Sequence, residues 1–148
     1  MRKHTSPRVS PVELERAADF RRALRRFLAR TNEVSAGAGL TSQRYDLLLA
    51  IKTGENETST VSELVTSLSL PQPAVTELVK RAEEAGLLER SVGADRRVSV
   101  LRLTAEADRR LMRAFLALRE ERRQLARDMR AVDASFRASA VGGNEVGK

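Results

Sequence analysis

The stretch Thr60–Thr104 decides the fold of this chain, and it reads TVSELVTSLSLPQPAVTELVKRAEEAGLLERSVGADRRVSVLRLT. Thr60 and Glu63 have the spacing of a capping box, which predicts that a short helix follows Thr60. Pro71 and Pro73 are tolerated only before or within the first turn of the next helix. The sequence therefore predicts two short helices joined by a tight turn.

The second of these helices is predicted to run to about Ala85, because Gly86 favours a helix end. Two runs rich in valine and leucine, 87–92 and 98–103, then indicate the strands of a hairpin. The tip between them, 93–97, reads GADRR. Adjacent arginines repel each other on a turn, so they favour contact with phosphates or a narrow minor groove, with a solvated turn as the alternative. Helix, turn, helix and hairpin is the order of a winged helix-turn-helix.

The apolar stripe of the second helix indicates which side meets a partner. Its inward-facing residues are Val75, Leu78, Val79 and Ala82. On the other side, the side chains expected to lie in or beside the major groove of DNA are Gln72, Ala74, Thr76, Glu77, Lys80 and Arg81. Arg96 and Arg97 at the hairpin tip are expected to reach the minor groove or phosphates. An ordinary surface helix would show the same stripe, so the stripe alone does not decide the function.

The segment before this stretch is predicted to contain two further helices. Ser10 and Glu13 form a capping box around Pro11, which predicts a helix over 11–36. Arginines cover most of that helix outside one apolar stripe, which is typical of a solvated face or of a basic surface that attracts an anionic partner. Thr41 is expected to cap the second helix.

Thr104 is expected to cap a long last helix over 105–138, with acidic residues in its first turn that favour the helix dipole. Apolar residues recur along it at heptad spacing, interrupted by Arg122. A helix of this length on so small a chain needs a partner, so 11–36 and 105–138 are predicted to be dimerisation helices. The chain after Ala138 is expected to be disordered.

The composition bounds the function. At 148 residues, with 41% hydrophobic and 32% charged side chains, the chain is expected to form one soluble cytoplasmic domain. No apolar run approaches the roughly 20 residues that span a membrane. There is no cysteine, and His4 is the only histidine, which excludes disulfides, thiol redox sensing and histidine-rich metal sites within one subunit. No catalytic residue, metal or cofactor is predicted.

The distribution of charge leaves one alternative open. The net charge is +7, but residues 60–104 carry six positive and six negative side chains. Bulk charge therefore does not identify this stretch as a DNA reader. The same scaffold could serve as a winged-helix module that binds another protein without sequence-specific DNA binding.

Four segments, in this order and spacing, resemble the MarR (multiple antibiotic resistance regulator) family of transcription factors. They read LTSQRYDLLLAI (40–51), TVSELVTSL (60–68), PAVTELVKRAEEAGLLER (73–90) and DRRVSVLRLT (95–104). The resemblance, which extends over about 40–130, implies a mainly α fold with a small β-hairpin wing. It implies one MarR-like domain over 1–148, with a DNA-binding lobe over 40–104 between the dimerisation helices.

The resemblance also implies a homodimeric repressor that binds a pseudo-palindromic operator in double-stranded DNA. Family wings carry a D-x-R element, matched here by Asp95 and Arg97. The arginine is expected to enter the minor groove, and the aspartate to orient basic side chains at the wing base. Members often have a basic residue where this chain has Glu77, which could accept a hydrogen bond from cytosine N4 or pair with Arg81 instead.

A small aromatic or phenolic effector is the last expectation that the resemblance carries. In the family such a ligand enters the cleft between the dimerisation helices and the winged lobe and releases the protein from DNA, and here the first, second and last long helices are expected to line that cleft. The candidate contacts here are Phe20, Phe27, Tyr45 and Phe115. Each of them could equally be an ordinary core residue.

Overall fold

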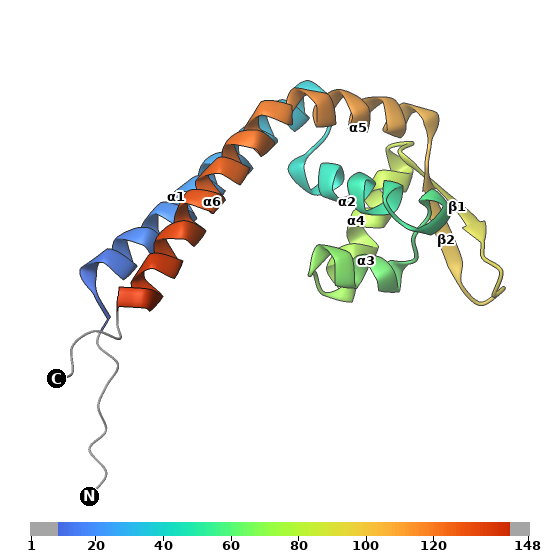
Figure 1. Ribbon diagram of the computed structural model, residues 1–148. Coiled ribbons are helices and arrows are strands. Elements are labelled where there is room, and N and C mark those ends of the chain that lie inside the picture. The colour runs from blue at the N-terminus through green and yellow to red at the C-terminus, as the bar shows by residue number, and fades with distance from the viewer. Residues whose placement is uncertain (1–8, 143–148) are drawn as a thin grey trace, which may run out of the picture. The chain divides into compact units, whose positions relative to one another are not determined.

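The computed structural model describes residues 9–142, which are mostly helical with one antiparallel hairpin (Figure 1). The described chain forms two compact units. One consists of 9–30 together with 119–142, and the other of 31–118. Within 9–142 no helix is both long enough and apolar enough to cross a membrane.

The first unit is built from two long helices, α1 (Pro11–Gly37) and α6 (Arg119–Gly142). The boundary between the units falls within α1, whose last turns belong to the second unit. The predicted capping box opens α1. The Ser10 N–H donates to Glu13 Oε2 at 2.7 Å, and the Glu13 N–H donates to Ser10 Oγ at 3.2 Å. An ion pair between Arg30 Nε and Glu121 Oε1 at 2.9 Å joins the two helices, which lie side by side.

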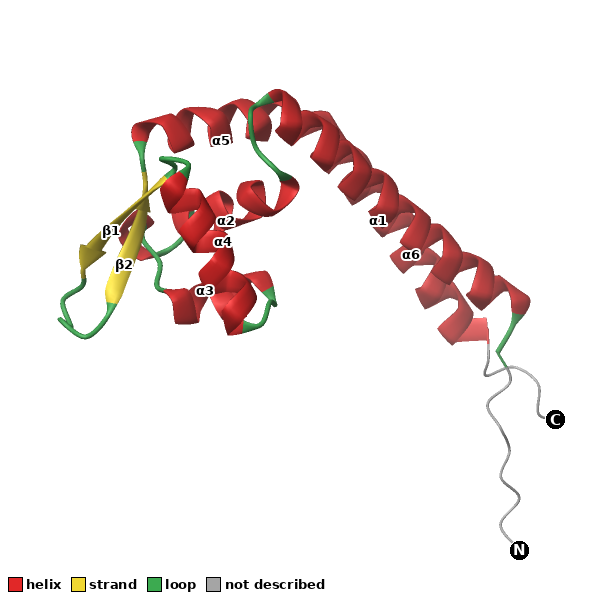
Figure 2. Cartoon of the chain, turned by 180° about the vertical axis from the view of Figure 1, so that it is seen from behind, coloured by secondary structure: helices red, strands yellow, loops and turns green. Residues whose placement is uncertain are grey.

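The second unit contains the predicted order of helix, turn, helix and hairpin (Figure 2). Its elements are α2 (Ser42–Lys52), η1 (Glu55–Glu57), α3 (Val61–Leu68), α4 (Gln72–Glu84), β1 (Leu88–Val92), β2 (Ser99–Leu103) and α5 (Ala105–Ala117). The side chains of Thr41, Thr60 and Thr104 each accept a hydrogen bond from a backbone N–H in the following first turn. The predicted winged helix-turn-helix fold is confirmed.

One hydrophobic core fills the second unit and draws side chains from α2, α3, α4, α5 and the hairpin. Its largest fully buried apolar side chains are Leu47, Leu48, Ile51, Leu64, Val75, Val79, Leu87, Leu101, Leu111 and Leu118. The apolar stripe predicted for α4 therefore does pack inward. This burial fixes the orientation of α4 within the unit.

The hairpin pairs β1 with β2 in the register Leu88↔Leu103. Both strands begin one residue later than predicted. A third segment, which the sequence did not predict, pairs with β2. The Ser59 N–H donates to the Leu101 oxygen at 3.1 Å, and the Leu101 N–H donates to the Ser59 oxygen at 2.8 Å. Since Ser59 directly precedes the cap of α3, this bridge ties the start of the helix-turn-helix to the wing.

The single helix expected over 105–138 is two helices in the structure, α5 and α6, separated at Leu118. Leu118 has φ −90° and ψ 7°, and its side chain is 1% exposed in the core of the second unit. The break coincides with the boundary between the units. The helix also continues past the predicted end at Ala138, as far as Gly142, and 143–148 lie outside the described residues.

Candidate nucleic-acid interface

The outward side of α4 carries the predicted DNA-facing residues. Because Val75, Val79 and Ala82 are at most 1% exposed, the helical repeat turns the opposite side to solvent. The candidates on that side are all exposed: Gln72, Ala74, Thr76, Glu77, Lys80 and Arg81. The structure therefore presents them together on one surface, where a groove of DNA could reach them.

The turn before α4 and the glycine after it set the length of this helix. Ser69 ends α3 in the left-handed region with φ 53°, and Pro71 stands at the N-cap of α4. Pro73 lies in the first turn, where its missing N–H costs no hydrogen bond. Gly86 has φ +72°, a conformation that side chains other than glycine rarely adopt, and it follows the C-cap Ala85.

Glu77 and Arg81 form an ion pair on the exposed side of α4. Arg81 Nε donates to Glu77 Oε1 at 2.8 Å, one helical turn away. Of the two roles open to Glu77 from the sequence, pairing with Arg81 is present in the free chain. The two charges cancel, and so do those of Lys80 and Glu84 on the same helix.

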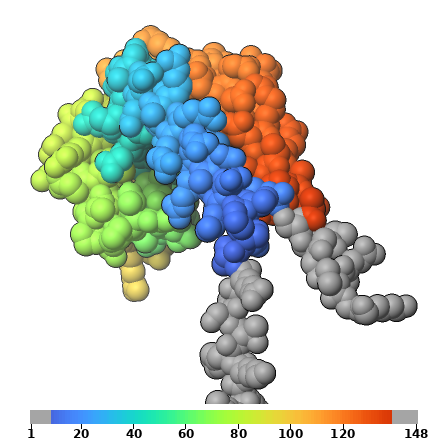
Figure 3. All heavy atoms as spheres, turned by 90° about the vertical axis from the view of Figure 1, so that its left-hand side faces the viewer, coloured from blue at the N-terminus to red at the C-terminus, as the bar shows by residue number. Residues whose placement is uncertain are grey.

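The hairpin tip presents two arginines on a turn that its own backbone holds. The Gly93 N–H donates to the Val98 oxygen at 2.9 Å, and the Arg97 N–H donates to Asp95 Oδ1 at 3.1 Å. Arg96 and Arg97 are exposed, and the tip (yellow) projects beyond α3 and α4 (Figure 3). Asp95 thus shapes the turn through a backbone contact, while its expected role toward basic side chains stays a prediction.

An ion pair that the sequence did not predict joins α4 to the wing. Arg90 on β1 donates to Glu83 through Nη2 at 2.6 Å and through Nε at 3.4 Å. These hydrogen bonds raise the pKa of the Arg90 guanidinium, so Arg90 stays protonated. The sequence does place opposite charges on either side of the Gly86 turn. Such an arrangement is too common to predict an ion pair by itself.

The four aromatic residues predicted to contact an effector lie in different environments. Phe20 and Phe27 belong to the first unit and are half-buried. Tyr45 is buried in the core of the second unit, and Phe115 is half-buried on α5. Tyr45 is therefore a core residue, as the alternative interpretation allowed.

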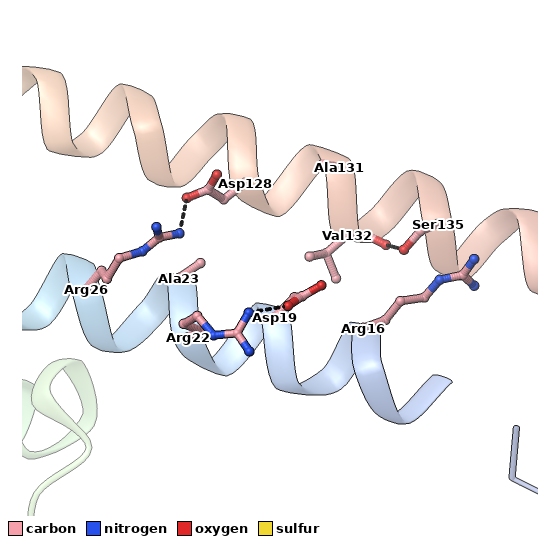
Figure 4. A pocket seen from close by; sticks show the side chains of 9 residues that line it. All are labelled: Arg16, Asp19, Arg22, Ala23, Arg26, Asp128, Ala131, Val132 and Ser135. Carbon is pink, nitrogen blue, oxygen red and sulfur yellow. Dashed lines mark hydrogen bonds and ion pairs between the residues drawn. The ribbon is translucent and has the colours of Figure 1, made fainter. Parts of the chain in front are cut away.

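Two grooves lie between α1 and α6 within the first unit. The larger, of about 370 Å³, is lined by arginines, aspartates and small side chains (Figure 4): Arg16, Asp19, Arg22, Ala23, Arg26, Asp128, Ala131, Val132 and Ser135. In it Arg22 pairs with Asp19 at 2.6 Å, and Arg26 pairs with Asp128 at 3.6 Å. The smaller groove, of about 250 Å³, has Phe27 among its walls.

Three comparisons with known proteins agree with this geometry. A model described as "MarR family" matches residues 38–98. The uncharacterized HTH-type transcriptional regulator YwoH of Bacillus subtilis (strain 168) is 29% identical over 104 residues, 70% of this chain and 74% of YwoH. AbsC, a MarR family transcriptional regulator from Streptomyces coelicolor, has a TM-score of 0.73 at 18% identity, covering 93% of this chain and 97% of AbsC. Residues 38–98, which contain the helix-turn-helix and most of the hairpin, thus match the MarR family.

A second MarR family regulator from Streptomyces coelicolor, Sco3205, was solved in complex with DNA. It has a TM-score of 0.72 at 19% identity, covering 97% of this chain and 96% of Sco3205. YwoH, AbsC and Sco3205 are all transcriptional regulators, so the comparisons support a DNA-binding regulator. Within the described residues, no group of three or more His, Asp or Glu is placed to hold a metal ion.

The ion pair between Glu83 and Arg90 leads to a prediction for the wing. Glu83→Gln should lower the free energy of unfolding by up to about 1 kcal/mol, because the pair is only partly buried. It should also lower DNA affinity, because one of the contacts that hold the wing to α4 is lost. Chemical denaturation and fluorescence anisotropy measure the two effects.

Glu84→Gln is the matched control for this prediction. It removes the same charge from the next residue of α4, and loss of a negative charge alone favours DNA binding. Equal DNA affinities of the two variants would show that the ion pair does not position the wing.

Proposed function

We propose that this protein is a MarR family regulator, a homodimeric repressor that binds a pseudo-palindromic operator in double-stranded DNA. The observation that carries the proposal is that one compact unit presents the exposed side of α4 beside an arginine-tipped hairpin. A helix of this kind enters the major groove, while a wing reaches the neighbouring minor groove or backbone. The complex of Sco3205 with DNA supports this reading of a similar fold.

The wing supplies the net positive charge of this surface. On α4 two positive side chains stand against three negative ones, whereas the tip carries Arg96 and Arg97 against Asp95. Attraction to phosphates therefore comes mainly from the tip, and α4 contributes through hydrogen bonds to base edges. Because two copies read the operator, its half-sites should be centred about 10 base pairs apart.

Exposed apolar side chains on the first unit support the homodimer. They are Val9, Val12, Leu14, Leu28, Met129 and Phe136. Leu14 and Leu28 lie two heptads apart on α1, and Met129 and Phe136 lie one heptad apart on α6, so each pair returns to one side of its helix. Apolar residues that repeat on one side of a helix favour burial against another chain.

The regulatory ligand is a small aromatic or phenolic molecule, and the smaller groove of the first unit suits it. Phe27 and Leu125 offer apolar walls, and Arg26 offers a cation for a phenolate or carboxylate. The Arg26 guanidinium is 3.6 Å from Asp128 and its side chain is largely exposed, so a ligand anion can displace this contact. Ligand binding there would change how α1 and α6 pair.

Replacing the wing arginine tests DNA binding. Arg97→Ala should weaken binding to the DNA upstream of the protein's own gene and lower the slope of log affinity against log salt by about 1. Fluorescence anisotropy at several salt concentrations measures both quantities. Arg113→Ala, on α5, removes the same charge outside the candidate surface and should leave the slope unchanged. An unchanged slope for Arg97→Ala would refute the wing contact, and wild-type protein that binds no DNA would favour a protein-binding module.

A charge introduced among the exposed apolar residues tests the homodimer. Leu28→Glu should convert the dimer to a monomer, because a carboxylate would be buried in the proposed interface. Sedimentation velocity measures the mass, and circular dichroism checks that the helices remain. Ala29→Glu is the control on the adjacent, arginine-rich side of α1 and should remain dimeric. If Leu28→Glu and Ala29→Glu sediment as species of equal mass, the proposed interface is contradicted.

Truncating the groove wall tests the effector. Some phenolic acids in a thermal-shift screen should raise the melting temperature of the wild type and weaken its binding to the operator. Phe27→Ala should abolish both responses, because an aromatic ring loses its apolar wall. Leu24→Ala, a half-buried residue of the same helix that lines neither groove, should keep them. The effector hypothesis fails if no phenolic acid changes either quantity.

A further inference from the structure

The Glu77–Arg81 pair occupies an unusual position for an ion pair that only stabilises a helix. It stands in the middle of the outward side of α4, among the residues that face DNA under the proposed function. The side chains remain 53% and 66% exposed, respectively, so solvent or a ligand can reach both. They also border a hollow of about 220 Å³, lined in addition by Gln43 and Leu70, which leaves space around the guanidinium.

The hydrogen bond between them leaves a defined set of groups unused. Nε of Arg81 donates to Oε1 of Glu77, so one of the five guanidinium N–H groups is occupied. Among the described residues, no other hydrogen bond or ion pair engages the terminal amino groups of Arg81 or Oε2 of Glu77. The pair therefore presents two donor nitrogens, the terminal amino groups of Arg81, beside one acceptor oxygen, Oε2 of Glu77.

This sequence of groups matches one edge of the DNA major groove. A G·C base pair presents guanine N7 and O6, which are both acceptors, followed by the N4 amino donor of cytosine. An A·T pair instead presents an acceptor, a donor and another acceptor, so both members of the protein pair would face a group of the same kind: Arg81 the adenine N6 donor and Glu77 the thymine O4 acceptor. We propose that Arg81 and Glu77 act as one reading unit that selects a G·C base pair in each half-site.

The two residues divide the work within this unit. Arg81 donates to guanine N7 and O6 through its two terminal nitrogens, and Glu77 accepts from cytosine N4 while it fixes the guanidinium. Glu77 also cancels the charge of Arg81, so α4 is not drawn to phosphates irrespective of sequence. A mismatched base leaves a carboxylate without a donor, which adds rejection of wrong sequences to preference for the right one.

The inference rests on the proposed DNA binding, and a selection experiment separates the two. Full-length wild type, Glu77→Ala, Arg81→Ala and Glu84→Ala select sites from a random double-stranded library, followed by anisotropy titrations on single-position variants. The wild type should require G·C at one position of each half-site, with a loss of about 5- to 150-fold for other pairs. Glu84→Ala removes a charge from the same helix outside the reading pair and should select the wild-type motif.

The two variants of the reading pair should differ from one another in a way that a structural ion pair does not explain. Glu77→Ala should relax the preference at that one position and keep or raise affinity for non-specific DNA. Arg81→Ala should relax the same position and lower affinity throughout. Both residues are exposed, so unchanged melting temperatures are expected and can be verified.

Each result has a definite meaning. A wild type that selects no motif would overturn the proposed DNA binding itself. A wild-type motif that Glu77→Ala leaves unchanged at every position would overturn the reading pair alone. Relaxation at an A·T position, or at two different positions for the two variants, would likewise overturn the single reading unit.

Discussion

Burial of one side of α4 is the constraint on which the proposed DNA-reading surface depends. Val75 and Val79 are almost fully buried, and burying such a side chain is worth on the order of 1.5–3 kcal/mol relative to exposure. The exposed pair of Glu77 and Arg81 is worth at most about 1 kcal/mol. The core therefore sets the rotation of α4 about its axis, and the polar side is free to vary with the sequence that it reads.

The wing is held to this helix by several short contacts at the Gly86 turn. Thr104 Oγ donates to the Gly86 oxygen at 2.8 Å, and its own N–H donates to the Leu87 oxygen at 3.0 Å. The same hydroxyl oxygen accepts a hydrogen bond from the Ala107 N–H and thereby caps α5. Glu83 and Arg90 add an ion pair on the outer side. A helix and a hairpin tied at one turn can meet adjacent grooves of DNA without rearranging, which lowers the entropic cost of binding.

Local signals in the sequence predicted most helices and strands. The features that the sequence did not predict depend on contacts between distant segments. The capping boxes at Ser10 and Thr60 act within four residues, so they were recognisable from spacing alone. The bridge from Ser59 to β2 rests on one backbone pair between distant segments, and no local pattern marks it. No proline or glycine stands near Leu118 to signal the helix break. The feature that accompanies the break is burial of the Leu118 side chain in the core, which is a long-range contact. The roles of the nine candidate residues toward DNA remain predictions, since exposure alone does not identify what a side chain binds.

In the proposed complex, α4 enters the major groove while the hairpin tip meets the adjacent minor groove or backbone. Methylation protection and hydroxyl-radical footprinting of the full-length protein on its upstream DNA test this most directly. Guanine N7 protection is expected in two major-groove windows centred about 10 base pairs apart, each flanked by protected sugars where a tip lies. Protected sugars without any protected guanine N7, or a single window, would contradict it.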